Sequence, residues 1–145
     1  LIGDGAVKAE LETEIRQKNI KNILFVGSKP RSEQNEFLNA CDIGLITLSS
    51  GMKGIGVPSK TYNIMAAGKP ILYIGDKDSE VDCYINKYRN GWSYDWSDSE
   101  SLITLLRELK FENRKEIAET GSQSLERLRN DFSKESVLNL FDELK

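Results

Sequence analysis

The order of apolar and amphipathic segments in this sequence predicts an α/β fold, with a parallel sheet covered by helices on both faces and a helical C-terminal tail. Three apolar runs, at residues 22–27, 42–48 and 69–75, alternate with segments whose apolar residues recur at helical spacing. Apolar strands separated by amphipathic helices are typical of buried parallel sheets. From Ser97 onward the sequence contains only helical patterns.

The N-terminal part of the chain repeats this alternation. It is predicted to contain, in order, a strand end at residues 1–2, a helix at 6–19, a continuous strand at 22–27 and a short helix at 32–40. Two residues are too few for a central strand, so we expect that an upstream strand is missing. Residues 1–145 are therefore predicted to be a single domain that is truncated on its N-terminal side.

The middle of the chain carries two helices with clear stop signals. The predicted order is a strand at 42–48, a glycine-rich loop at 49–57, a helix at 59–67, a strand at 69–75, a helix at 79–90 and a short edge strand at 91–96. Gly68 and the pair Asn90-Gly91 are the predicted C-caps, because these residue types accept the left-handed backbone that ends many helices.

Composition excludes several classes of function. The chain is 39% hydrophobic and 30% charged with a net charge of -3, which gives no overall case for nucleic acid as a partner. It contains no histidine, which excludes Ser-His-Asp and Cys-His catalysis, and no acidic cluster suggests a metal site. Cys41 and Cys83 are predicted to be buried free thiols in a reducing compartment, with a disulfide as the alternative.

The start of the helix at residues 59–67 predicts a site for a phosphorylated ligand. Pro58 presets the backbone angle of a helix start, and Ser59 can cap the free amides. Lys60 places a cation in the first turn, which opposes the helix dipole by roughly a few tenths of a kcal/mol unless an anion binds there. The alternative is a routine helix start with a solvated surface lysine.

The expected position of this helix in the fold favours the same interpretation. Gly54 and Gly56 allow the backbone to approach a ligand closely. Ligands of parallel α/β sheets bind beyond the carboxyl ends of the strands. The glycine-rich loop lies there, and so do the turns after Ile2 and Gly27. The turn at residues 3–5 alone is a weak signal and is interpreted as a bare tight turn.

The sequence resembles the C-terminal half of the glycosyltransferase family 4 enzymes, which are retaining and have the two-domain GT-B architecture. The resemblance rests on "NILFVG", "NEFLNACDIGLITL", "PSKTYNIMAAGKPIL" and "SEVDCYI", and it extends from Leu1 to about Leu109. The most specific part is P-S-K followed by M-A-A-G-K-P. It is most similar to bacterial members of the fucosamine-transferase-like group, which assemble surface polysaccharides. The resemblance implies a Rossmann-like domain that binds a nucleoside diphosphate sugar.

The same resemblance assigns roles to individual residues. Ser28, Lys29 and Pro30 would contact the nucleobase, largely through their backbone. Gly54 and Gly56 would lie beside the donor sugar and diphosphate. Ser59 and Lys60 would hold the diphosphate, and Lys60 would stabilise its charge as it leaves. Asn63 would face the ribose hydroxyls. The family is generally metal-independent, so no cofactor is expected.

The sequence departs from the family pattern at two positions. Many members carry two glutamates eight residues apart, where this chain has Ile55 and Asn63. An asparagine can hydrogen-bond a hydroxyl but cannot form the stronger charge-assisted bond. We therefore expect weaker nucleotide binding. The basic pair and the acceptor domain of the family would lie upstream, so the 145 residues alone are expected to be inactive.

The expected function of the parent protein is sugar transfer, with retention, to a saccharide or lipid-linked acceptor in polysaccharide or glycolipid biosynthesis. Two alternatives stay open: a degenerate binding module without activity, favoured by Ile55 and Asn63, and a sugar-nucleotide epimerase, which would use carboxylates such as Asp76, Asp78 and Glu80. The expected location is the cytoplasm, with the inner face of the membrane as an alternative for the parent protein.

Overall fold

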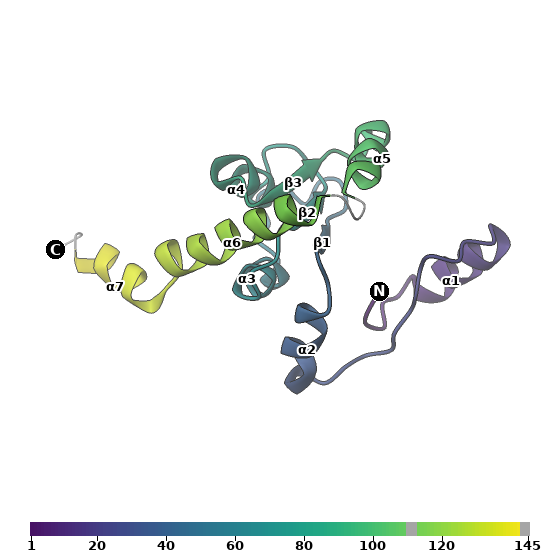
Figure 1. Cartoon of the computed structure of the whole chain (residues 1–145), viewed down its shortest axis with the longest axis horizontal. Coiled ribbons are helices and arrows are strands. Elements are labelled where there is room, and N and C mark those ends of the chain that lie inside the picture. Colours follow the sequence, from purple (N-terminus) through teal and green to yellow (C-terminus); the bar gives the residue numbers. More distant parts are fainter. Residues whose placement is uncertain (110–112, 143–145) are drawn as a thin grey trace. The chain divides into compact units, whose positions relative to one another are not determined.

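The computed structural model describes residues 1–109 and 113–142 of the chain. Within it, Leu1–Phe37 and Leu38–Lys145 form two compact units (Figure 1). Among the described residues, no helix combines the length and the apolar character needed to cross a membrane.

The first unit contains one regular helix, α1 (Lys8–Gln17), and a short 3₁₀ turn, Arg31–Glu33. The strand predicted at residues 22–27 is not formed along its length. Only one parallel bridge appears, between Ile2 and Val26, and it is closed by Val26 N–H to Leu1 O (2.8 Å) and Gly3 N–H to Val26 O (3.1 Å). The prediction of a continuous strand was wrong because a partner segment this short supplies only one bridge, and Leu24 stays 73% exposed. The next helix, α2, is Gln34–Asn39.

The second unit is built on a three-stranded parallel sheet in the order β1 (Gly44–Thr47), β2 (Ile71–Ile74), β3 (Gly91–Tyr94). Gly44 pairs with Ile71, and Ile71 pairs with Gly91, so the three strands start level with one another. Their carboxyl ends consequently lie at one edge. The three strands that the sequence predicts in this part of the chain are confirmed.

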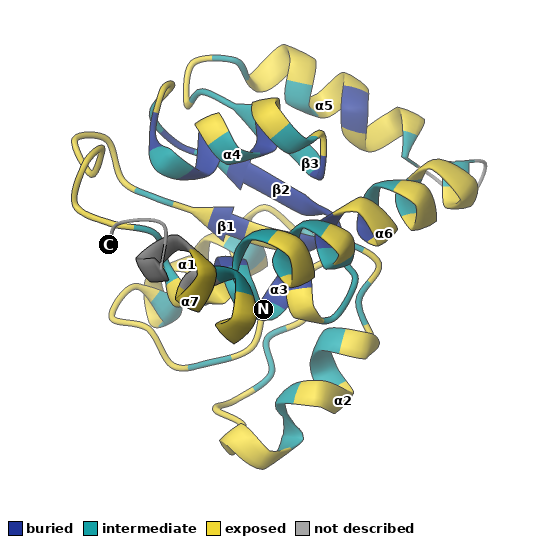
Figure 2. Cartoon of the chain, turned by 90° about the vertical axis from the view of Figure 1, so that its left-hand side faces the viewer, coloured by how far each residue is buried: buried dark blue, intermediate teal, exposed yellow. Residues whose placement is uncertain are grey.

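One face of the sheet carries the core. Alternate strand residues point to this face, and they pack against helices α3 (Ser59–Ala66) and α4 (Glu80–Tyr88). The core cluster consists of Ile46, Ile64, Met65, Ile71, Tyr73, Val81 and Ile85 (Figure 2). Burying each of these side chains contributes about 1.5–3 kcal/mol, so this cluster holds β1, β2, α3 and α4 together.

The other face of the sheet meets helix α5 (Ser99–Glu108), which contacts β3 beside Tyr94 and buries Leu105. Figure 1 shows α4 and α5 on opposite sides of β2 and β3. The predicted fold class, a Rossmann-like parallel sheet with helices on both faces, is confirmed. The predicted helical C-terminal tail is also present, as α6 (Arg114–Asp131) and α7 (Lys134–Asp142).

Helix α6 is fastened to the sheet by close backbone contact. A Cβ built on the buried Gly121 would lie 2.2 Å from the carbonyl oxygen of Gly68. Three residues later, Ser124 Oγ donates a hydrogen bond to the carbonyl oxygen of Asn90 (3.1 Å). The helix therefore touches both the turn before β2 and the entry to β3.

Aromatic rings join the end of α6 to two other helices. Phe132 lies 5.2 Å from Tyr62 of α3 and 5.3 Å from Tyr84 of α4, measured between ring centroids. Burial raises the pKa of Tyr84 to about 12, because water is removed from around its phenolate. The cluster anchors the helical tail to the core side of the sheet.

The two predicted C-caps have different outcomes. Gly68 has φ +63°, and the bonds Lys69 N–H to Ile64 O and Gly68 N–H to Met65 O form a Schellman motif, as the sequence indicates. At the end of α4 the left-handed residue is Arg89 (φ +52°) rather than the pair Asn90-Gly91. Asn90 is fully buried instead, and its backbone already belongs to the approach to β3.

Both cysteines are free, as the sequence predicts. The expectation that both are buried was wrong, because Cys83 is exposed on α4 and Cys41 is only half-buried. The half-burial raises the pKa of the Cys41 thiol.

Candidate donor-binding site

The loops that follow β1, β2 and β3 meet beyond the carboxyl ends of the strands. The amide of Gly51, in the loop after β1, donates to Asp76 Oδ2 in the loop after β2 (2.7 Å). Trp96, after β3, donates from its indole Nε1–H to the carbonyl oxygen of Leu48 (2.8 Å). This edge is where the ligands of parallel α/β sheets bind. The prediction that the glycine-rich segment lies at this edge is confirmed within the second unit.

The glycine-rich segment, residues 49–57, is called the glycine loop below. Gly51, Gly54 and Gly56 all have positive φ, at +84°, +79° and +134°. A Cβ added at any of the three would meet no atom within 4 Å, so the backbone here borders open space. The predicted site residues Gly54 and Gly56 therefore lie where a ligand can approach the backbone closely.

The N-terminus of α3 follows the glycine loop directly. Pro58 is the N-cap, with φ -57°, and no side chain caps the helix. Ser59 is the first helical residue, so the expectation that its side chain caps the helix was wrong. The amides of Ser59 and Lys60 have no acceptor among the described residues, and the first turn contains no acidic residue. These free donors and the positive end of the helix dipole favour an anion.

Lys60 and Asn63 extend this face of the helix. Neither belongs to the core cluster: Lys60 is exposed and Asn63 is half-buried. Lys60 forms no ion pair with any residue that the structure describes. Because residues three positions apart on a helix are neighbours on its surface, Asn63 lies one turn beyond Lys60. The ammonium, the free amides and the Asn63 amide together could hold a phosphate and a neighbouring hydroxyl.

The predicted nucleobase contacts lie in the first unit. Ser28, Lys29 and Pro30 are all exposed. The amide of Ser28 donates to Asp4 Oδ2 (3.0 Å), and the Lys29 ammonium pairs with Glu33 (3.1 Å). Part of this loop's hydrogen-bonding capacity and the charge of Lys29 are thus used internally.

The turn at residues 3–5 does more than the sequence suggests. Hydrogen bonds from Lys8 and Ser28 lower the pKa of Asp4 to about 2. The exposed carboxylate thereby ties the turn to the Ser28 loop. The prediction that this turn binds no ligand stays a prediction. The contact made by the Asp4 side chain is an addition that the sequence did not indicate.

A network around the buried Asp82 was missed by sequence reasoning. Its carboxylate accepts hydrogen bonds from Asp78 N–H (2.7 Å), from Asn86 Nδ2 (3.0 Å) and from the Ser93 hydroxyl. Ser79 caps α4 by accepting from the Asp82 amide (3.3 Å), and its hydroxyl donates to Tyr73 Oη (2.9 Å). The sequence signals only Ser79 at a helix start, because Tyr73, Asn86 and Ser93 lie apart from one another on β2, α4 and β3.

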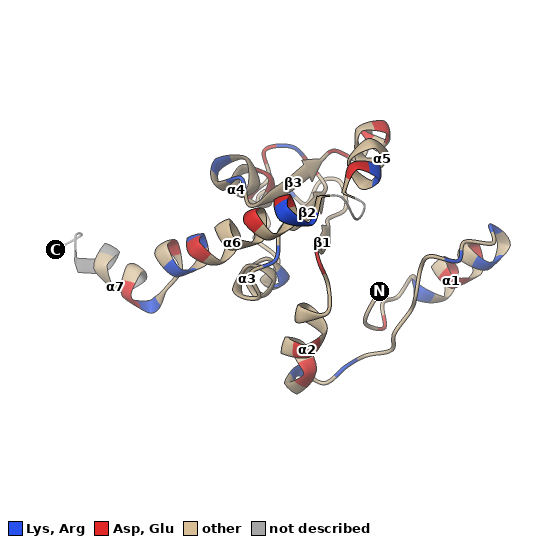
Figure 3. Ribbon diagram, viewed as in Figure 1, with Lys and Arg blue, Asp and Glu red and all other residues tan. Residues whose placement is uncertain are grey.

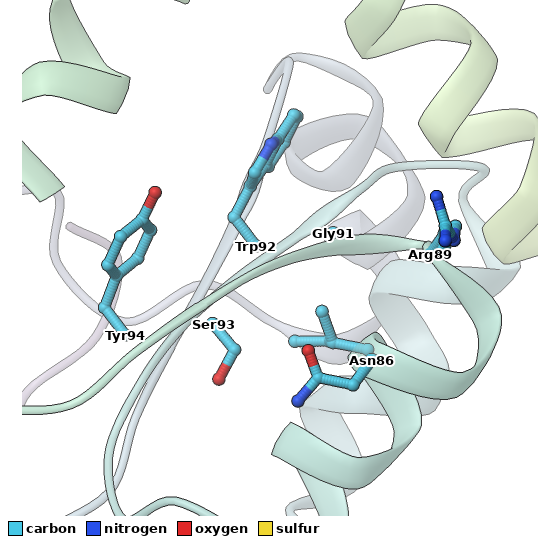
Figure 4. Close-up of a pocket in the computed structure, with 7 residues that line it drawn as sticks. Asn86, Arg89, Gly91, Trp92, Ser93 and Tyr94 are labelled. Carbon is cyan, nitrogen blue, oxygen red and sulfur yellow. The ribbon is translucent and has the colours of Figure 1, made fainter. Parts of the chain in front are cut away.

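The hollow in Figure 4 is not part of the candidate donor-binding site. It has a volume of about 400 Å³ and lies along α4 and β3, where Trp92 and Tyr94 project to one side of the strand and Ser93 to the other. None of the predicted donor-binding residues lines it.

Charge is dispersed over the described part of the chain. Basic and acidic residues are interspersed along α6 in Figure 3. The described residues contain no group of three or more acidic or cysteine side chains that could hold a metal ion.

Comparisons with known proteins agree with this geometry. The family model described as "Glycosyl transferases group 1" matches residues 1–124. A probable glycosyltransferase, WbjE of Pseudomonas aeruginosa, is 38% identical over 108 residues. That match covers 74% of this chain and 27% of the relative, so the chain matches about a quarter of the relative's length.

A solved structure shares the fold. The crystal structure of Anabaena Alr3699/HepE in complex with UDP-glucose superposes with a TM-score of 0.74 at 18% identity. The match covers 99% of this chain and 39% of the other, and at this identity it shows the fold alone.

Proposed function

Because the chain belongs to the glycosyl transferases group 1 family, we propose that it is the donor-binding part of a retaining glycosyltransferase. The observation that carries this proposal is the N-terminus of α3, which follows an open glycine loop. There the amides of Ser59 and Lys60 and the Lys60 ammonium have no hydrogen-bond acceptor or ion-pair partner among the described residues. The substrate is a nucleoside diphosphate sugar, and the nucleotide in the HepE structure supports this class.

The chemistry proposed for this site is electrostatic. As the bond between the sugar and the diphosphate breaks through an oxocarbenium-like transition state, negative charge builds on the departing diphosphate, and the sugar passes to the acceptor. The Lys60 ammonium and the amides of Ser59 and Lys60 stabilise that charge without rearranging. Gly54 and Gly56 let the backbone lie against the donor, Asn63 bonds a ribose hydroxyl, and the backbone at Ser28–Pro30 contacts the base. This role requires neither metal nor cofactor.

Features of the whole parent protein are further parts of the proposal. Its acceptor is a saccharide or a lipid-linked saccharide, held by a separate domain, and its product enters bacterial surface polysaccharide as in the fucosamine-transferase-like group. It works in the cytoplasm or at the inner face of the membrane. Residues 1–145 act as one nucleotide-sugar-binding domain.

A thermal-shift panel with UDP, GDP, ADP and dTDP at millimolar concentration tests the donor site. A ligand that binds only the folded state raises Tm, by linkage. We expect Tm to rise for the nucleotide of one base only. Lys60→Ala should weaken the binding of that nucleotide by roughly tenfold or more, because it removes a charge-assisted contact.

A matched control is Lys115→Ala. Lys115 is the second residue of α6, as Lys60 is of α3, and its side chain is 90% exposed. It should leave nucleotide binding unchanged. An equal loss in both variants would contradict the assignment of Lys60. A protein that binds none of the nucleotides, even as Asn63→Glu, would favour the degenerate binding module.

A further inference from the structure

The loop between β2 and α4, residues 75–79, is called the acidic loop below, and it contacts the glycine loop. We propose that Asp76 is a positioning residue that holds the glycine loop in the shape in which it receives the donor. The inference rests on the proposed function and adds a residue to it.

The glycine loop has few restraints of its own. Residues 49–56 are all exposed, and three of them are glycines with positive φ. The turns within the loop are closed by long bonds, Met52 N–H to Ser49 O and Ile55 N–H to Met52 O, both 3.3 Å. A segment of this kind samples many conformations unless another part of the protein holds it.

The strongest polar contact to this loop comes from Asp76. The distance from Gly51 N to Asp76 Oδ2 is 2.7 Å, which is typical of a charge-assisted hydrogen bond. A second contact joins Lys53 Nζ to Asp78 Oδ2 at 3.5 Å, but both side chains are more than half exposed. Exposed pairs of this kind contribute little. Asp76 is therefore the main polar restraint.

The acidic loop is a firm support for that restraint. Its first residue, Gly75, continues the β ladder through its amide to Tyr94 O (3.0 Å). At its far end, the Asp78 amide is bound by the buried Asp82 carboxylate, and Ser79 is fully buried against Tyr73. Asp76 stands between these two anchors, so its carboxylate has a fixed position from which to hold Gly51.

A restrained loop binds a ligand more tightly because less conformational freedom is lost on binding. The same carboxylate also carries negative charge at an edge that is to receive a diphosphate, and the two effects oppose each other. They can be separated by substitution, because asparagine keeps an oxygen acceptor for Gly51 N–H and loses the charge.

The experiment compares Asp76→Ala with Asp76→Asn. Hydrogen exchange of the amides at residues 49–57 is measured without nucleotide, and the dissociation constant is measured for whichever of UDP, GDP, ADP or dTDP binds. We expect Asp76→Ala to speed exchange in the glycine loop and to weaken nucleotide binding by roughly fivefold. Asp76→Asn should stay within about twofold of the unchanged protein in both measurements.

Asp78→Asn is the matched control. It removes the same charge two residues away, and asparagine tolerates the positive φ (+57°) of that position. It should change neither measurement appreciably. The Tm of each variant without nucleotide shows that it is folded.

Two results would overturn the proposal. Unchanged exchange in Asp76→Ala would mean that Asp76 does not restrain the loop. Tighter nucleotide binding in both Asp76 variants would mean that the carboxylate competes with the ligand. If the unchanged protein binds no nucleotide, the proposed function fails, and so does the role of Asp76 in donor binding. The exchange rates of the glycine loop would still show whether Asp76 holds that loop.

Discussion

The glycine loop and the acidic loop leave adjacent strands at the same edge of the sheet, yet they are built in opposite ways. The glycine loop is exposed and borders open space. The acidic loop begins and ends in buried residues. It is bonded to α4, and the amide of its first residue, Gly75, donates to Tyr94 O of β3. The difference shows how one edge can combine an adaptable ligand contact with a fixed support.

Removing the buried carboxylate of Asp82 should destabilise the acidic loop, the more rigid of the two. Asp82→Ala would leave the donors on Asp78, Asn86 and Ser93 without their acceptor. We expect the free energy of unfolding to fall by about 2–3 kcal/mol, measured by urea denaturation. Asp82→Asn, which keeps an acceptor oxygen, should lower the free energy of unfolding by a smaller amount. Equal stability of Asp82→Ala and the unchanged protein would contradict the role given to this network.

A pair of glycine substitutions compares the two loops directly. A Cβ at Gly75 would lie 2.2 Å from Tyr73 Oη, whereas a Cβ at Gly54 would meet nothing within 4 Å. We expect Gly75→Ala to lower the free energy of unfolding by about 1–3 kcal/mol. Gly54→Ala should lower it by about 1–2 kcal/mol, from its positive φ alone.

Thermal unfolding of both glycine variants measures this difference. If the Gly54 variant proves the less stable of the two, the glycine loop is more tightly held than its open surroundings indicate.

Nucleotide binding should act on the glycine loop and leave the acidic loop unchanged. On adding the nucleotide that raises Tm, exchange should slow by several-fold at the amides of the glycine loop and at Ser59 and Lys60. The amide of Asp78 is already bonded to Asp82 and should change little. Hydrogen exchange with and without ligand provides the measurement. Equal slowing in both loops would argue for a general stabilisation instead of a local site.

The smallest expected effect concerns an exposed carboxylate, in contrast to the buried one of Asp82. The pKa of Asp4 is lowered to about 2 from 3.8, so its bond to the Ser28 amide should persist well below pH 4. A group with a lowered pKa contributes stability above its unfolded value, and this is lost as pH falls through the folded value. The Ser28 amide chemical shift should therefore move near pH 2. A midpoint near 3.8 would show that the contact is absent in solution.

Local patterns in the sequence predicted the sheet and the α3 region well. The apolar runs of β1 and β2 and the glycine that ends α3 depend on neighbouring residues, which a sequence displays directly. The run at 22–27 has the same apolar character, but strand formation also needs a partner segment, and only one bridge is available.

The arrangement around the candidate site could be predicted only in part, for the same reason. Pro58, Lys60 and the loop glycines are contiguous and form a visible pattern, whereas Asp82 is recognisable only when Ser93 and Asn86 are seen beside it. Asp76 was singled out for a different reason, as a possible acid or base, because nothing in the sequence shows that Gly51 lies opposite it.

The contact between Gly121 and Gly68 has a consequence for how this protein can vary. Because a side chain at position 121 would collide with the backbone of the turn before β2, no choice of side chain at position 68 can relieve the collision. Related sequences should therefore keep glycine at position 121, or change it only where the chain between α3 and β2 has also been lengthened or redirected. An alignment of relatives would then show less sequence variation at position 121 than at the exposed positions on either side of it.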